Sequence, residues 1–156
     1  MRRKDRAIVD RPGLEDMLAR ADTCRLAFAV GGEPYIVALS YGFSWEGELP
    51  VLYFHGAREG RKLDSMRANP RVCFQLDLDH EILTGPDPCD WGTRYGSIVG
   101  WGELRETEGD AARIDALCAI NRHYGWSGEP VFKPGMLAAT SVLELRVSEM
   151  TGKRKS

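Results

Sequence analysis

The sequence lacks the cysteine and histidine patterns that mark metal sites and redox dithiols. Its cysteines lie far apart, without a Cys-x-x-Cys pair, and its three histidines show no metal-ligand spacing. Because zinc sites and redox dithiols need closely spaced ligands, we expect neither here. Cys24, Cys73 and Cys118 lie in apolar patterns and are expected to be small core residues in a reducing compartment. Cys89 lies in a Pro/Gly-rich loop and is expected to be exposed.

Long apolar runs and a large net charge are also missing. No stretch is apolar for long enough to span a membrane, and the N-terminus lacks the apolar core of a signal peptide, so we expect a cytoplasmic protein without a membrane partner. The formal net charge of −2 argues against a general nucleic-acid binder, and the basic ends MRRK and TGKRKS are expected to be solvated. The chain has 156 residues, 43% of them hydrophobic, and is expected to form one domain over residues 1–156.

The spacing of apolar residues predicts six strands and three short helices. Arg71–Asp79 alternates apolar and polar residues, as a half-buried strand does, whereas Pro34–Phe43 is apolar on both faces, as expected of a strand buried on both sides. Glu81–Arg94 contains two prolines and two glycines and is interpreted as a loop. This order favours an antiparallel barrel or curled sheet with helices at its ends. The strands are expected at 25–30, 34–43, 51–55, 71–79, 95–105 and 141–147, the first three forming an antiparallel meander.

The helix boundaries follow from capping residues. Pro12 is suited to open a helix, because its missing N–H would be unpaired in the first turn. A second helix is expected from about Glu59 to Ala68. A third is expected to begin at the capping-box-like Thr107–Asp110 and to end at Gly125. Gly100 and Gly102 lie on one face of a strand and predict a bulge or a close approach by another backbone or a ligand.

The stretch Leu52–Pro70 carries the strongest chemical signal. An apolar strand ends at His55-Gly56, and Arg58, Arg61 and Lys62 follow around Gly60 before a short helix. The N–H groups at a helix start have no intrahelical partner and, with nearby cations, suit a phosphate. Arg61 and Lys62 are therefore candidate phosphate ligands; the alternative is a solvated basic helix face.

Three other side chains are candidates with a plain structural alternative. His55 could donate a hydrogen bond or a proton to a substrate, or could be a structural histidine at a strand end. Trp101 and Trp126 could stack on a planar ring, with Trp126 in the better loop position, or could lie in the core or at an interface.

In several stretches, in the right order, the sequence resembles the flavin-binding split barrels of the pyridoxamine 5′-phosphate oxidase type, and among them the branch associated with nitroimidazole resistance. The HxAxEGRKxDxxxxNP pattern beginning at His55 is the most specific. The resemblance covers nearly the whole chain. Its other stretches are MRRKDR, PYIVALSYGF, YGSIVGWGEL, the helix ending in His123-Tyr124, and SVLELRVSEMTGK.

The resemblance implies a homodimer of six-stranded antiparallel split barrels, mainly β with short helices, which binds FMN in clefts shared between subunits. The strand with Ile36, Val37, Ala38 and Leu39 would line the flavin ring and donate backbone hydrogen bonds. Phe54 and His55 would flank the flavin, with His55 also next to the substrate. Arg61 and Lys62 would hold the phosphate, and Ser97 would reach the cleft from the other subunit.

The sequence also departs from the family pattern at two places. The C-terminal Arg/Pro-containing segment of the true pyridoxamine phosphate oxidases is replaced by MTGKRKS, so vitamin B6 oxidation is not expected. The serine expected after His55 is Gly56, which removes one hydroxyl from the phosphate site.

The leading hypothesis is an FMN-dependent oxidoreductase that takes electrons from NAD(P)H or another reductant and reduces small nitroaromatic or quinone-like compounds. A second hypothesis is a non-catalytic flavin-binding or sensor protein, because no residue besides His55 resembles a dedicated acid or base. A third is a haem or deazaflavin in the same cleft.

Overall fold

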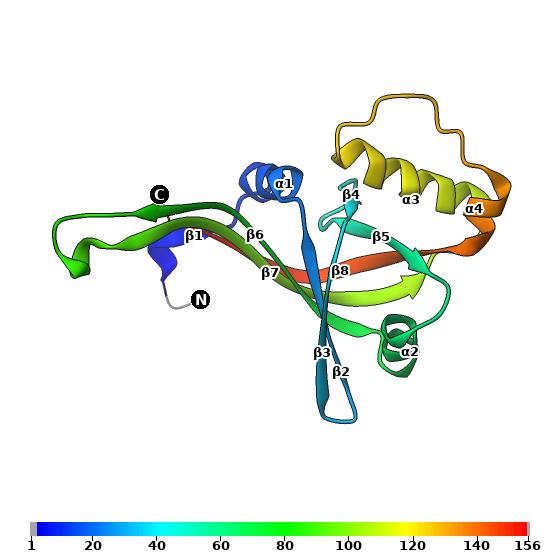
Figure 1. Cartoon of the computed structure of the whole chain (residues 1–156), viewed down its shortest axis with the longest axis horizontal. Helices are drawn as coiled ribbons and strands as arrows, with labels where there is room; N and C mark the ends of the chain where they lie inside the picture. Colours follow the sequence, from blue (N-terminus) through cyan, green and yellow to red (C-terminus); the bar gives the residue numbers. More distant parts are fainter. Residues whose placement is uncertain (1–2, 156) are drawn as a thin grey trace.

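The computed structural model describes residues 3–155 as a single curled antiparallel sheet with helices packed around it (Figure 1). Met1, Arg2 and Ser156, which belong to the basic ends predicted to be solvated, lie outside the described residues. The strands are β1 (Ala7–Ile8), β2 (Cys24–Val30), β3 (Glu33–Leu39), β4 (Gly42–Ser44), β5 (Val51–Ala57), β6 (Arg71–Leu83), β7 (Gly92–Glu106) and β8 (Thr140–Lys155). The α-helices are α1 (Arg11–Arg20), α2 (Arg61–Ala68), α3 (Asp110–His123) and α4 (Pro134–Ala139), with 3₁₀ turns η1 (Lys4–Arg6) and η2 (Pro88–Asp90).

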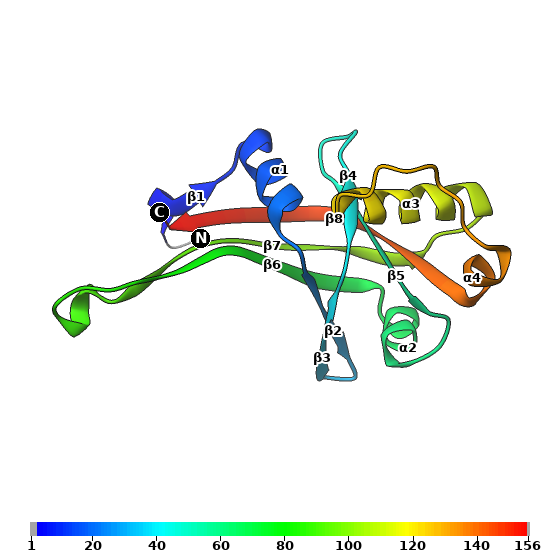
Figure 2. The same ribbon diagram turned by 45° about the horizontal axis from the view of Figure 1, so that its top comes forward.

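The strand order explains why the sheet curls. Along the path β3-β2-β6-β7-β8-β5-β4 each neighbour pairs antiparallel, and β1 pairs with β8 off this path. The first and last strands of the path, β3 and β4, are joined by only Ser40 and Tyr41. Because the chain links the two ends of the path so closely, the sheet must bend back on itself. Figure 2 shows β3 and β4 as one continuous segment across the middle of the molecule.

The segment Pro34–Phe43 is therefore not one strand, although both antiparallel pairings of the predicted meander are present on its two halves. Its first half forms β3 against β2, and its second half forms β4 against β5. Tyr41 is fully buried at the break, and its hydroxyl donates to the carbonyl of Leu18. The two-sided apolar pattern arises because residues such as Val37 pack on the core while Ile36 faces outward with 65% of its surface exposed.

The interval 81–94 is also not simply a loop. β6 continues to Leu83 and β7 begins at Gly92, so the two strands form a hairpin arm that projects from the body (Figures 1 and 2). β8 runs to Lys155 because it pairs with β7 along nearly its whole length. With the short β1 and β4 added, residues 3–155 form eight strands where six were expected.

The helix ends predicted at Pro12, Ala68 and Gly125 are right, and the capping box predicted at Thr107 is wrong. Asp10 caps α1 by accepting from the Gly13 N–H, and Pro12 lies in the first turn. Gly125 follows α3 with a positive φ of 87° and donates its N–H to the Arg122 carbonyl at 2.9 Å, as a C-terminal glycine does. The capping box at Thr107 is wrong, because Gly109 is the N-cap of α3 and no side chain caps it.

The strand glycines allow close backbone packing, as predicted. A Cβ on Gly100 would lie 2.6 Å from the carbonyl oxygen of Glu149, and a Cβ on Gly102 would overlap the backbone of Arg146. The register between β7 and β8 shifts between Trp101 and Gly102. The two glycines therefore serve a bulge in the β7–β8 pair.

Two apolar clusters stabilise this arrangement. The larger fills the curled sheet and includes Leu26, Phe54, Phe74 and Leu145, and the smaller joins α3 to Val142 of β8. Cys24 and Cys118 are buried and Cys89 is exposed, as expected. The core position predicted for Cys73 is wrong, because its side chain is half-buried and lies on the face of β6 opposite to the core residues Val72 and Phe74. In the part of the chain that the structure describes, no helix is long and apolar enough to cross a bilayer.

We expect Gly42→Ala to destabilise the fold. A Cβ at Gly42 would overlap the backbone of Ala119 and Ile120, so α3 must move off β4, at a cost of about 1–3 kcal/mol. Urea denaturation measures the change. Gly47→Ala is the matched control, because a Cβ there meets no atom within 4 Å. Equal stability of the two variants would contradict the close packing of β4 on α3.

Candidate functional site

Lys62 is a half-buried cation without a counter-charge among the described residues. It lies in the first turn of α2, and its Nζ rests against Gly56 at the end of β5, where a Cβ would overlap it. Burial lowers the pKa of the Lys62 ammonium group. Among residues 3–155, no carboxylate lies within ion-pair distance of Lys62. A cation that is taken partly out of water without a partner suits a site for an anion.

The start of α2 adds to this preference for an anion. Gly60, the N-cap residue, has a φ of 117° and offers no side chain to the free N–H groups of the first turn. These N–H groups and the helix dipole favour negative charge at this end. Gly56, found where the resemblance predicts serine, leaves the space that the ammonium group occupies. At Gly60-Arg61-Lys62, where the sequence predicts a phosphate site, the structure therefore has the uncapped N–H groups of α2 and the ammonium group of Lys62.

His55 precedes Gly56 on β5, and its side chain is exposed at the sheet surface. Partial burial lowers its pKa from the usual value near 6.5, and the positive charge of Lys62 lowers it further. The imidazole is therefore neutral at pH 7 and gains a proton only in acid. A neutral imidazole offers one N–H donor and one nitrogen acceptor to a bound molecule.

Arg61 is not positioned like Lys62. Its Nη2 donates to Oε1 of Glu33 at 2.6 Å, and its guanidinium lies 4.5 Å from the centroid of the Tyr35 ring. Both partners belong to β3, so the Arg61 side chain contacts that strand, whereas Lys62 rests against Gly56 of β5. Sequence reasoning missed Glu33 and Tyr35, since the ion pair spans 28 positions of the chain and no local pattern signals it.

β3 is an edge strand. Its residues pair with β2 and, within the described part of the chain, with no other strand. The backbone N–H and C=O groups on its outer edge are therefore free to bind a ligand. Ile36 and Ala38 are exposed, whereas Val37 and Leu39 pack against the core. The structure thus brings the four predicted ring-lining residues together on a strand with a free edge.

The remaining predicted site residues are dispersed. Phe54 is fully buried in the core, so its side chain does not face a surface cleft. Ser97 pairs with Lys153 of β8, whereas His55 pairs with Val142, eleven residues away on the same strand or roughly 35 Å at the usual rise. Trp126 is 36% exposed in the loop after α3, with its ring against Gly128. Within one chain, Ser97 and His55 do not share a site.

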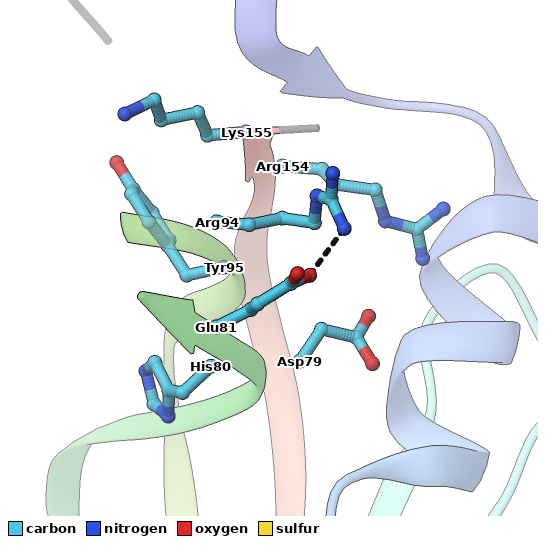
Figure 3. Close-up of a pocket in the computed structure, with 7 residues that line it drawn as sticks. All are labelled: Asp79, His80, Glu81, Arg94, Tyr95, Arg154 and Lys155. Atoms are coloured by element: carbon cyan, nitrogen blue, oxygen red, sulfur yellow. Dashed lines mark hydrogen bonds and ion pairs between the residues drawn. The ribbon is translucent and has the colours of Figure 1, made fainter. Parts of the chain in front are cut away.

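A separate cavity of about 360 Å³ lies at the base of the β6–β7 arm (Figure 3). Its charged groups are largely paired within the chain: Arg94 with Glu81, Asp79 with Arg20, and Arg154 with Asp16. Residues predicted from the sequence as site residues do not line it. Its lining is Asp79, His80, Glu81, Arg94, Tyr95, Arg154 and Lys155. The internal pairing favours a structural role at the base of the arm.

Comparison with known proteins identifies the family. Residues 10–154 match the family model described as pyridoxamine 5′-phosphate oxidase. The chain belongs to the pyridoxamine 5′-phosphate oxidase family. The family resemblance and the split-barrel fold inferred from the sequence are thereby confirmed. No curated protein matches the chain.

Solved structures extend the comparison. A candidate 5-nitroimidazole antibiotic resistance protein from Bacteroides thetaiotaomicron has a TM-score of 0.80 and 27% identity, over 95% of this chain and 86% of that one. This neighbour supports the predicted nitroimidazole-resistance branch. A FAD-binding protein from Mesorhizobium loti has a TM-score of 0.67 and 25% identity, over 95% and 96% of the two chains. A flavocytochrome from Azotobacter vinelandii, with a TM-score of 0.80 over 100% and 72% of the chains but 18% identity, shows the fold alone.

We expect Lys62→Gln to raise the pKa of His55, because the substitution removes the positive charge that helps to keep the imidazole neutral. An NMR titration of the imidazole C–H resonances measures the change. Arg58→Gln is the matched control, since Arg58 is not among the causes of the shift at His55. Equal His55 pKa values in the wild type and in Lys62→Gln would show that Lys62 does not lie beside this ring.

Proposed function

We propose that the protein binds FMN, with the phosphate at Lys62 and at the start of α2. The half-buried ammonium group of Lys62, without a carboxylate partner among residues 3–155, is the observation that carries this proposal. The uncapped first turn of α2 supplies further donors, and Arg61 is the first residue of that turn, with its guanidinium over Tyr35. The FAD-binding relative from Mesorhizobium loti supports a flavin as the cofactor class.

The free edge of β3 suits the planar end of the same ligand. Backbone donors and acceptors on an edge strand can bind the polar rim of a flavin ring without specifying a side chain, and the exposed Ile36 and Ala38 offer it apolar contact. Bound FMN would supply reversible one- and two-electron redox chemistry. The role of the chain is to hold the phosphate and present the ring edge.

We assign to the loaded protein an oxidoreductase activity toward small nitroaromatic or quinone-like compounds, with NAD(P)H or another reductant as the electron source. The relative from Bacteroides thetaiotaomicron supports this substrate class. His55 is the side chain suited to the substrate, because its neutral ring keeps an N–H that can donate to a nitro or quinone oxygen. A non-catalytic flavin-binding protein is the second candidate, since His55 is the only general acid or base predicted beside the flavin.

The two candidates differ in electron transfer. FMN-loaded protein is mixed with NAD(P)H and then with a nitroimidazole in a stopped-flow instrument, and flavin absorbance is followed. Loss of flavin absorbance with the reductant and its return on adding the nitroimidazole support the oxidoreductase. The return should be slower in His55→Ala. A flavin that the reductant does not reduce, or that stays reduced when the nitroimidazole is added, supports the non-catalytic protein.

We expect Lys62→Ala to weaken FMN binding by about tenfold or more, because a charge-assisted hydrogen bond contributes about 1.5–3 kcal/mol. Fluorescence quenching of FMN measures the affinity. Arg58→Ala is the control, since Arg58 is exposed and donates to the Ala138 carbonyl instead. Unchanged affinity in Lys62→Ala would place the phosphate elsewhere.

The outer face of the sheet suits a second copy of the chain. Trp101, Cys73, Ala27 and Ile36 occupy consecutive register positions on β7, β6, β2 and β3, and so form one apolar row across four strands. All four side chains are half-buried or exposed in the single chain. Contiguous apolar surface of this kind is typical of homodimer interfaces. A dimer through this row would bring each Ile36, beside the proposed ring site, against the partner.

We expect Ala27→Glu to convert the dimer into monomers, because it buries a charge at the centre of this row. Light scattering at micromolar concentration measures the mass. Ala111→Glu is the control, because Ala111 is exposed in the first turn of α3. A wild-type monomer, or a dimer in Ala27→Glu, would contradict this interface.

A further inference from the structure

The carboxylate of Glu33 binds the guanidinium group of Arg61, which is the group that a phosphate would bind. Its Oε1 accepts from Nη2 of Arg61 at 2.6 Å, while the guanidinium lies over the ring of Tyr35. Lys62, the neighbouring cation, has no such partner in the described part of the chain. The two basic residues that the sequence predicts as a pair therefore differ in the structure: one is free, and the other is held by a carboxylate of β3.

This ion pair contributes little to the stability of the fold. The side chains of Arg61 and Glu33 are 56% and 73% exposed, and ion pairs between exposed groups are worth little in water. Other contacts hold the β2–β3 hairpin in place: the ladder between the two strands, and the Asn69 side-chain amide, which donates to the Ala29 carbonyl at 3.0 Å. Loss of the Glu33 charge should leave the hairpin and α2 folded.

Carboxylate and phosphate bind a guanidinium group through the same planar fork of N–H donors. A phosphate at the start of α2 that binds Arg61 must either displace the Glu33 carboxylate or lie close to its negative charge. In both cases Arg61 contributes less to the binding free energy of the phosphate, whereas the contribution of Lys62 is unaffected. A flavin without a phosphate does not meet this cost.

We propose that Glu33 is a competitor, built into the chain, for the cofactor phosphate at Arg61, and that it sets how strongly the site prefers phosphorylated over unphosphorylated flavins. The proposal rests on the proposed FMN site. On binding, Arg61 exchanges the carboxylate for the phosphate while its guanidinium stays over Tyr35. Glu33 is thus a specificity-determining residue that lowers the affinity for FMN.

The test compares FMN with riboflavin in the wild-type protein and in Glu33→Gln. Fluorescence quenching at low salt should give an FMN dissociation constant about 3- to 10-fold lower in Glu33→Gln. In this variant the phosphate no longer has to break the Arg61–Glu33 ion pair or lie beside the Glu33 charge. Riboflavin affinity should not change. The gain for FMN should shrink at 0.5 M salt, which screens exposed charges within a few ångströms.

Two further variants isolate the contact. Glu48→Gln removes an exposed carboxylate that forms no ion pair within residues 3–155, and it should not alter FMN affinity. In an Arg61→Ala background, Glu33→Gln should change FMN affinity less than twofold, because the contested guanidinium is gone. Thermal unfolding of each variant checks that the fold is kept.

The outcomes separate the two proposals. Failure of the wild-type protein to bind FMN overturns the flavin site and the role of Glu33 together. Binding of FMN with unchanged or weaker affinity in Glu33→Gln overturns only the role of Glu33, as does an equal gain for riboflavin. A gain restricted to FMN, dependent on Arg61 and reduced by salt, supports the competition.

Discussion

The proposed site depends on one electrostatic constraint: a lysine ammonium group is held half-buried at the start of α2 without a carboxylate among the described residues to neutralise it. Three features of the chain produce this. Gly56 leaves room for the ammonium group, Gly60 is an N-cap without a side chain to bind the first N–H groups of α2, and the short turn between β5 and α2 brings Lys62 against Gly56. The same charge adds to the effect of burial in lowering the pKa of His55. In the proposed site, phosphate affinity and the protonation state of the neighbouring imidazole would therefore be coupled through Lys62.

The curled sheet supplies the second part of the site. Because β3 and β4 are the ends of the strand path and only two residues join them, the sheet bends but leaves β3 with an unpaired edge. That edge lies close enough to α2 for Glu33 and Tyr35 to hold Arg61. A barrel closed by a full hydrogen-bonded ladder would have no such edge. The open edge thus links the architecture to the proposed binding of a planar ligand.

Local sequence patterns predicted those parts of the fold that depend on residues close together in the chain. The alternation in Arg71–Asp79, Pro12 at the start of α1 and the C-terminal Gly125 follow from side-chain period and backbone φ, and each is confirmed. The break at Ser40-Tyr41 was not predictable from the pattern, because it depends on burial of Tyr41 against α1. The extension of β6 and β7 into an arm was not predicted, because the glycines and prolines between residues 81 and 94 favour a loop. The structure places them at and near the tip of the arm. The Glu33–Arg61 pair joins distant residues and requires the folded sheet.

The most direct test of the account is the visible spectrum of purified protein after addition of FMN and removal of the excess by gel filtration. The account predicts that flavin absorption bands stay with the protein, about one FMN per chain, and that Lys62→Ala loses them under the same conditions. A wild-type protein that emerges colourless would contradict the central claim. A Soret band from the purified protein in place of the flavin bands would contradict it as well and would identify haem as the cofactor.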